Sequence, residues 1–118
     1  DFPFFLGSYV MNKTDKQIYV MKAEIFKALA HPIRMAIFDF IKDKEKCVCE
    51  ICEFVESSYA NVSKHLNLMK NSGLIDFRKE GNSIFYFVKM SCAINFDSCV
   101  NNIIKNNIQN HKSLISKL

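Results

Sequence analysis

The sequence predicts one mainly α-helical domain with a small β-hairpin. Its 118 residues are enough for a single hydrophobic core and too few for two ordinary domains. Nearly half of the residues are apolar, a quarter are charged and only three are glycine, a profile typical of compact helical proteins. Apolar side chains recur at three- and four-residue steps along most of the chain, whereas strand-forming residues are concentrated in residues 74–89.

The N-terminal half is expected to contain two helices. The first covers residues 13–30 and starts near Thr14, because its apolar residues form a wide stripe on one face. The second runs from Pro32, a residue that the first turn of a helix tolerates, to Ile41. We expect the histidine between them, His31, to serve as a turn or capping residue.

The charged run at residues 42–46 is expected to be a solvated turn, followed by a short helix over residues 49–55. A fourth helix is expected over residues 59–71, because Ser57 and Ser58 can cap its N-terminus with their hydroxyl groups. The charged run therefore separates the first pair of helices from the second.

The C-terminal part is expected to contain the hairpin and a last helix. Residues 74–78 and 83–89 are rich in aromatic and β-branched side chains and flank a charged tip, so they are expected to pair as two strands. Residues 92–118 have an apolar stripe opposite asparagine and lysine and are expected to form one long helix. Four helices, two strands and a helix in this order are typical of a winged helix-turn-helix domain, in which one helix enters the DNA major groove.

Two segments are distinguished within the chain. Residues 1–12, which contain aromatic residues, proline and an internal methionine, are assigned to an N-terminal extension or an expression remnant. Residues 13–118 are assigned to the winged-helix domain. No stretch approaches the roughly 18 apolar residues that span a membrane, so a cytoplasmic protein without a membrane partner is expected.

The outward face of the expected fourth helix carries polar side chains and a cation, which can bond base edges and neutralise phosphates. Residues 57–90 hold five cationic and two anionic side chains, and so +3 of the formal net charge of +4. The alternative is that these residues form a solvated helix face and an ordinary hairpin turn with no role in DNA binding. The order of elements disfavours this alternative. The residues expected to face DNA are Tyr59, Asn61, Ser63, Lys64, His65 and Asn67 of the helix, and Arg78, Lys79 and Asn82 of the hairpin tip.

Three of the five cysteines, Cys47, Cys49 and Cys52, are crowded into six residues, a spacing too tight for a disulfide framework. Reduced thiols in such a cluster are typical of metal-binding or redox-active sites. On a regular helix Cys49 and Cys52 share a face, whereas Cys47 does not. One ion bound by all three sulfurs is therefore expected to deform the start of the short helix beside the DNA-reading helix.

Thiolate ligands select soft ions. As(III) and Sb(III) favour three sulfur ligands in a pyramid, which three neighbouring cysteines can provide, so one of these ions is the expected inducer. Cd(II) or Zn(II) is the alternative. Zn(II) needs four ligands and could add His31, Cys92, Cys99 or Glu50.

Two further interpretations remain open. The thiols can form a redox or persulfide sensor in the same DNA-binding fold, or the fold can be a protein-interaction module with a structural zinc ion. Cys92 and Cys99 have the simpler interpretation of small hydrophobic residues. No serine–histidine–aspartate set, glycine-rich phosphate loop or recognisable carboxylate pair is present, so an enzyme is not expected.

Residues 26–90 resemble the ArsR (ArsR/SmtB) family of metal-responsive repressors. The matching strings are FKALAHPIRMAIFDFI, KCVCEICE, SSYANVSKHLNLMKNSGLI and FRKEGNSIFYFV. The CxCxxC spacing is similar to that of the arsenite and antimonite sensors. The cadmium and lead sensors of the family add N-terminal cysteines, and none precedes Cys47 here; the family also often has glutamine where this chain has Tyr59.

The resemblance implies a repressor that dimerises through its first and last helices and binds a palindromic operator in double-stranded DNA. Binding of the ion to Cys47, Cys49 and Cys52 then releases the DNA and derepresses a resistance operon. The resemblance carries DNA-facing roles over to Ser58, Tyr59, Asn61, Ser63, Lys64 and His65.

Overall fold

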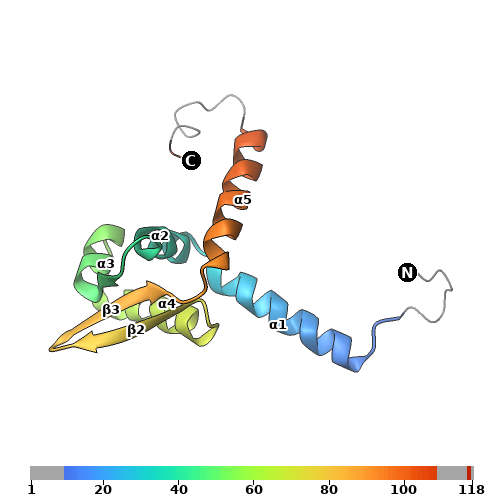
Figure 1. Ribbon diagram of the computed structural model, residues 1–118, viewed down its shortest axis with the longest axis horizontal. Helices are drawn as coiled ribbons and strands as arrows, with labels where there is room; N and C mark the ends of the chain where they lie inside the picture. Colours follow the sequence, from blue (N-terminus) through green and yellow to red (C-terminus); the bar gives the residue numbers. More distant parts are fainter. Residues whose placement is uncertain (1–9, 109–116, 118) are drawn as a thin grey trace.

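The computed structural model describes residues 10–108 and 117 (Figure 1). Its elements in chain order are α1 (Lys13–Leu29), α2 (Pro32–Ile41), β1 (Lys46–Cys47), α3 (Val48–Val55), α4 (Tyr59–Asn71), β2 (Ile75–Glu80), β3 (Ser83–Val88) and α5 (Cys92–Asn107). The predicted order of helices and hairpin strands is confirmed. The greater part of the expected N-terminal segment and the expected end of the last helix lie outside the described residues.

The hydrophobic core lies between α2, α3, α4 and the sheet. The stripe expected on α4 is buried, since Val62, Leu66 and Met69 are each at most 1% exposed. Burial of a side chain of this size contributes about 1.5–3 kcal/mol, so the stripe holds α4 firmly on its neighbours. The other large side chains that are fully buried are Ile37, Phe38 and Ile41 of α2, Ile51 of α3 and Ile75 of β2.

Local hydrogen bonds set the residues at which the helices begin. A reciprocal capping box between Asn12 and Asp15, with N···O distances of 2.8 and 3.1 Å, starts α1. His31 caps α2 as expected, because its Nδ1 accepts a hydrogen bond from the N–H of Ile33 at 3.0 Å. Ser58 caps α4 through its Oγ, which accepts a backbone N–H at 3.2 Å.

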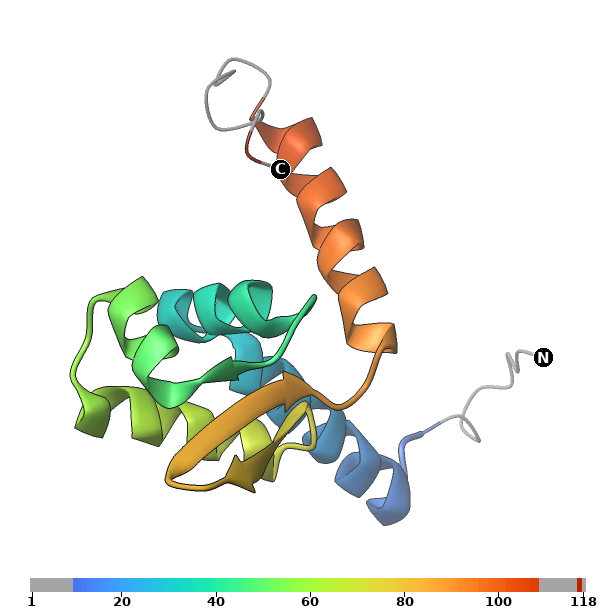
Figure 2. The same cartoon turned by 60° about the vertical axis from the view of Figure 1, so that its left-hand side comes forward.

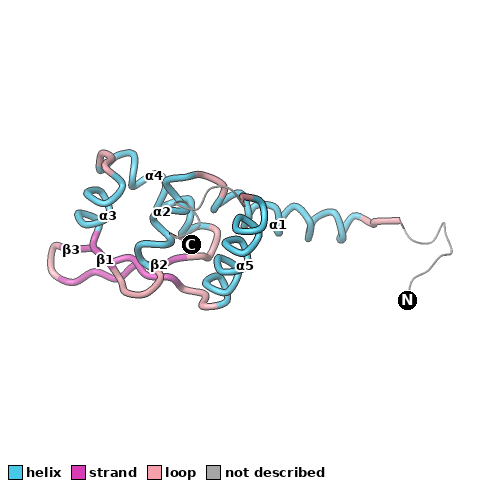
Figure 3. Tube along the Cα trace, turned by 90° about the horizontal axis from the view of Figure 1, so that it is seen from above, coloured by secondary structure: helices cyan, strands magenta, loops and turns pink. Residues whose placement is uncertain are grey.

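The sheet has three strands, whereas the sequence predicts two. β1 pairs antiparallel with β3, with Lys46 opposite Tyr86 and Cys47 opposite Phe85, so the strand order is β1-β3-β2. Figure 3 shows the three strands in magenta. The expectation of a solvated turn is therefore wrong at Lys46. A strand of two residues is too short to show an alternation of apolar and polar side chains in the sequence. β1 forms because it pairs with β3, which lies far along the chain.

The hairpin itself is longer at its tip than expected. β2 and β3 pair from Ile75 opposite Val88 to Glu80 opposite Ser83, which leaves a two-residue turn. Gly81 in this turn has a φ of +62°, a conformation that glycine adopts without steric cost. This β2–β3 hairpin, the wing, projects beyond α3 and α4 (Figure 1).

The long helices α1 and α5 extend away from the body formed by the other elements (Figures 1 and 2). The start of α5 is held by an edge-to-face contact between Phe96 and Phe26, whose centroids are 5.3 Å apart, and by the ion pair of Asp97 with Lys42 at 3.3 Å. None of the described helices is both long and apolar enough to cross a bilayer.

Candidate functional site

The start of α4 presents several of the expected DNA-binding residues to solvent. Tyr59, in the first turn, is 62% exposed, and Lys64 one turn later is also exposed. Ser63 between them is half-buried and Asn67 is exposed. A phenol, an ammonium group and an amide are therefore accessible on α4. Lys64 and Asn67 lie away from the buried stripe, whereas Tyr59, three positions before Val62, lies at the exposed end of the stripe itself.

Two other expected residues build the turn that leads into α4. The Asn61 backbone N–H donates to Ser58 Oγ at 3.2 Å, and the Asn61 side-chain amide donates to Ser57 Oγ at 2.7 Å. Before them, Glu56 ends α3 in the left-handed conformation with a φ of 51°. These bonds fix the N-terminus of α4 relative to α3.

His65 is half-buried between α4 and the start of α2. Its ring centroid lies 4.5 Å from that of His31, and its Nδ1 lies 3.2 Å from Nη1 of Arg34. Burial, followed by electrostatic interactions with His31 and with the cations Arg34 and Lys64, holds the pKa of His65 below its usual value. The neutral ring can accept a hydrogen bond from Arg34, whose Nη2 also donates to the Lys27 carbonyl at 3.2 Å. His65 thus links α4 to α1 and α2.

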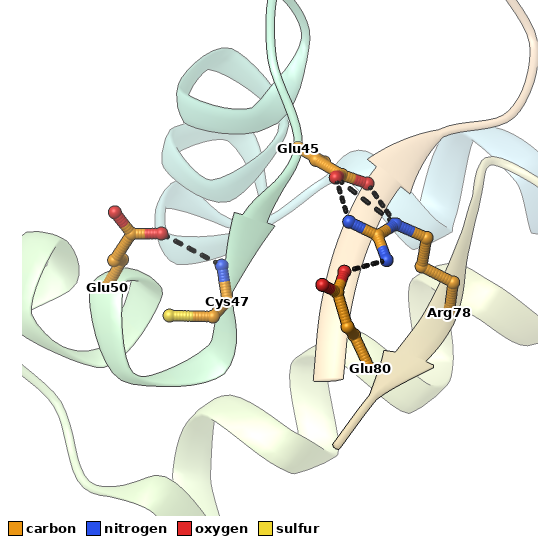
Figure 4. A network of polar contacts seen from close by, with 5 residues as sticks. All are labelled: Glu45, Cys47, Glu50, Arg78 and Glu80. Atoms are coloured by element: carbon orange, nitrogen blue, oxygen red, sulfur yellow. Dashed lines mark hydrogen bonds and ion pairs between the residues drawn. The ribbon is translucent and has the colours of Figure 1, made fainter. Parts of the chain in front are cut away.

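The three expected wing residues have different surroundings. Lys79 and Asn82 are exposed, and neither makes an ion pair or side-chain hydrogen bond within residues 10–108. Arg78 donates from Nε to Glu45 at 2.8 Å and from Nη1 to Glu80 at 2.6 Å (Figure 4). These carboxylates raise the pKa of Arg78 above its usual value. Arg78 is therefore held within the wing sheet.

The thiol cluster lies at the junction of β1 and α3. Cys47 is half-buried, ends β1 and precedes α3 with an extended backbone (φ −79°, ψ 161°). Cys49 is exposed in the first turn of α3, and Cys52 is half-buried one turn later. Cys49 and Cys52 line one hollow together with Tyr59, while Cys47 and Cys49 line a second hollow with the same tyrosine. The thiols therefore border Tyr59, the first residue of α4.

The cluster fits a soft ion by its donor chemistry, since three thiols lie around two adjacent hollows. No three cysteine, histidine or carboxylate side chains converge on one point in the part of the chain that the structure describes. Burial, followed by the neighbouring Cys49, raises the pKa of the Cys52 thiol, so a thiophilic ion must displace its proton. Because Cys47 is the N-cap residue and lies outside α3, binding of one ion by all three sulfurs requires a conformational change at the junction of β1 and α3.

Two carboxylates near Cys47 have roles that the sequence does not predict. Glu50, expected only as an additional zinc ligand, accepts the Cys47 backbone N–H at 3.0 Å (Figure 4). This N–H and then the Cys47 thiol hold the pKa of Glu50 below its usual value. A capping-box spacing could have indicated this contact. No local pattern indicates the bond of Glu45 to Arg78, because 33 positions separate them.

Known proteins match a central part of the chain. Residues 31–76 match the family described as "Bacterial regulatory protein, arsR family". A cadmium resistance transcriptional regulatory protein CadC homolog of Staphylococcus aureus is 42% identical over 65 residues, which are 54% of each chain. An uncharacterized HTH-type transcriptional regulator of Methanocaldococcus jannaschii is 37% identical over 71 residues, covering 59% of this chain and 80% of the relative. The arsenical resistance operon repressor of Escherichia coli is 33% identical over 69 residues, covering 58% and 59%.

The fold also matches a solved structure. The homodimeric winged helix-turn-helix DNA-binding domain Mb0332 of Mycobacterium bovis, a possible ArsR-family regulator, superposes with a TM-score of 0.75 at 21% identity, covering 87% of this chain and 96% of that one. This confirms the winged helix-turn-helix fold. The aligned region spans little more than half of the S. aureus and E. coli relatives, at 54% and 59%. From the family match and these identities, the chain belongs to the ArsR family of bacterial regulatory proteins.

Proposed function

We propose that this ArsR-family transcriptional regulator is a cytoplasmic repressor that binds palindromic operator DNA as a homodimer. It dissociates when As(III) or Sb(III) binds Cys47, Cys49 and Cys52, and so derepresses a resistance operon. The observation that carries the proposal is that Tyr59, the first residue of α4, borders both hollows lined by these thiols. A ligand that draws the three sulfurs together must therefore rearrange the surroundings of the DNA-reading helix.

The DNA contacts are proposed for the exposed side of α4 and for the wing tip. Tyr59 and Lys64 are accessible on α4, and Lys79 and Asn82 on the wing. Amide and hydroxyl groups can read base edges, while the lysines neutralise phosphates. Ser58, Asn61 and Ser63 complete the proposed contact set at the margin of the helix. His65 and Arg78 differ from Lys64 and Lys79, because their side chains already bond to side chains of other elements of the domain.

Dimerisation is supported by the uncovered apolar side chains of α1 and α5. Met21 and Phe26 of α1 are 64% and 56% exposed, and Ile103 of α5 is 54% exposed. Covering apolar surface stabilises an assembly by about 25 cal/mol per Å² removed from water. A twofold dimer also presents two α4 helices to the two halves of a palindrome.

The choice of ion depends on the number of ligands. As(III) and Sb(III) can be satisfied by the three sulfurs, and the E. coli relative is named for arsenical resistance. A second candidate is Cd(II) or Zn(II), because Glu53 lines the same hollow as Cys49 and Cys52 and could add a carboxylate oxygen. The S. aureus relative is named for cadmium resistance. A Glu53→Gln variant would then weaken the response to Cd(II) or Zn(II) and leave the arsenite response intact.

A redox or persulfide sensor is the competing function for the same thiols. The raised pKa of Cys52 disfavours this thiol as the attacking group, because a protonated thiol is a poor nucleophile. Mass spectrometry after treatment with peroxide or polysulfide tests this function directly. Oxidation of a pair of cysteines that releases the operator without any added ion would replace the metal-sensing proposal.

The proposal is tested by titrating the full chain on its operator, identified by selection from random double-stranded DNA. Fluorescence anisotropy follows operator release by arsenite, antimonite, Cd(II) and Zn(II). We expect arsenite to weaken operator binding by roughly 5- to 150-fold. The response should be lost in Cys47→Ser, Cys49→Ser and Cys52→Ser and kept in Cys99→Ser, whose cysteine is exposed on α5. Operator release by zinc but not by arsenite would refute As(III) or Sb(III) as the inducer. A normal response of Cys47→Ser would refute the three-cysteine binding site.

A further inference from the structure

One row of residues joins the thiol cluster to the wing across all three strands. Phe85 of β3 lies opposite Cys47 of β1 on one side and opposite Arg78 of β2 on the other. The Arg78 guanidinium carbon lies 4.7 Å from the centroid of the Phe85 ring. A movement of the backbone at Cys47 therefore acts directly on β3, one of the two strands of the wing.

A second connection bypasses the middle strand. Arg78 donates from Nε to Oε1 of Glu45 at 2.8 Å, and its Nη2 forms an ion pair with Oε2 of the same carboxylate (Figure 4). Glu45 lies just two residues before Cys47. Two bonds from one guanidinium to one carboxylate restrict the relative orientation of both groups. The segment that leads into the thiol cluster is thus tied to the outer strand of the wing.

The same contacts argue against a phosphate contact for Arg78. Its remaining amine group, Nη1, donates to Glu80 at 2.6 Å, so the guanidinium lies between two carboxylates. A DNA phosphate brought to this position would meet both negative charges. Lys79, the next residue, has no such partner within residues 10–108 and remains the cation suited to the DNA backbone.

We propose that Glu45 and Arg78 form a latch that couples the thiol site to the wing, with Arg78 as a positioning residue and not a DNA contact. The inference rests on the proposed function, since the signal it transmits is ligand binding at Cys47. Rotation of the Cys47 N-cap shifts β1 and Glu45, and the latch and the Phe85 row carry this shift to β2 and β3. The wing then responds to the inducer together with α4.

The latch is tested first without any ion, by hydrogen exchange of the full chain. Glu45→Gln removes the charge and keeps the size of the side chain. Asp43→Asn is the matched control, because this exposed carboxylate in the same loop makes no ion pair among the described residues. We expect faster amide exchange in residues 76–88 for Glu45→Gln and for Arg78→Gln, and wild-type exchange for Asp43→Asn. Unchanged exchange in both latch variants would overturn the proposal, whether or not arsenite is the inducer.

Operator binding then separates the latch from a DNA contact. If Arg78 neutralised a phosphate, Arg78→Gln would lower the slope of log Kd against log salt by about one. Under our proposal this slope is unchanged, and Glu45→Gln reduces the arsenite-induced change in Kd by about two- to fivefold, the range of an exposed ion pair. If arsenite does not change the operator Kd of the wild-type chain, the proposed function is refuted. The hydrogen-exchange measurement still tests the latch in that case. A salt slope reduced in Arg78→Gln alone would refute the latch.

Discussion

His65 lies beside the guanidinium of Arg34 and against the ring of His31, so a proton on its imidazole is disfavoured in the folded chain. The pKa of His65 is therefore lower in the folded chain than its unfolded value of about 6.5. As the pH falls below this value, the unfolded chain binds the proton first, and the folded state loses stability. We expect the free energy of unfolding, measured by urea denaturation, to decrease as the pH falls from about 7.5 to about 5.5.

The control for this pH dependence is His65→Gln, which keeps a polar side chain but does not titrate. Part of the decrease should disappear in this variant, while the loss of stability below about pH 4.5, where carboxylates such as Glu45 and Glu50 titrate, should persist. An identical slope for both proteins between pH 7.5 and 5.5 would contradict the assigned state of His65.

Leu66 and Leu68 allow a matched comparison of two positions on α4. Leu66 is 1% exposed in the core, whereas Leu68 is 43% exposed. Leu66→Ala is expected to lower the free energy of unfolding by about 2–5 kcal/mol, because it removes buried methyl groups and leaves a cavity. Leu68→Ala should cost less than about 1 kcal/mol, since most surface substitutions have small effects. Chemical denaturation of both variants measures the difference, and equal losses would contradict the orientation of α4.

The helices could be predicted from the sequence because each carries its own information. In α4 the serine cap and the three buried residues at helical spacing predict both the bounds and the inward face. β1 could not be predicted in this way. Its two residues contain no pattern, and they form a strand only because β3 offers hydrogen-bonding groups beside them.

The candidate site likewise contains residues that the sequence predicts and contacts that it does not. The thiols at 47, 49 and 52 and the exposed polar residues of α4 are visible in the sequence, because their types and spacing are local. The inward position of His65 and the ion pair of Arg78 with Glu45 depend on side chains from other elements. Sequence reasoning treats such residues as exposed charges, since it cannot place partners that are distant along the chain.

The attachment of α5 to the body depends on the nearly buried carboxylate of Asp97, which is 8% exposed and pairs with Lys42 at 3.3 Å. Lys42→Met would leave this carboxylate without its cation, and we expect a loss of about 1–3 kcal/mol in the free energy of unfolding. The control is Asp39→Asn, because Asp39 pairs with Lys42 at 2.8 Å but is 61% exposed and contributes little. A larger loss for Asp39→Asn in thermal or urea denaturation would contradict this ranking.

Within the part of the chain that the structure describes, more large apolar side chains are exposed on α1 and α5 than on the other helices and strands. If a second copy covers this surface, Ile103→Glu places a charge in the interface and should shift the mass in solution from twice 13.7 kDa toward that of one chain. Asn102→Glu adds the same charge at an exposed polar position of the same helix and should leave the mass unchanged. Light scattering after size-exclusion chromatography distinguishes them; equal masses for both variants would argue against this interface.

The strand order leaves β1 and β2 as the two outer edges of the sheet. One edge is only two residues long, and the other carries Arg78, Lys79 and Glu80 toward its tip. Short and charged edges are poor templates for strand addition, so neighbouring molecules gain little by extending one another's sheets. Fibre growth through the wing is thereby discouraged, and the proposed twofold contact of α1 and α5 is a closed one that ends at two copies.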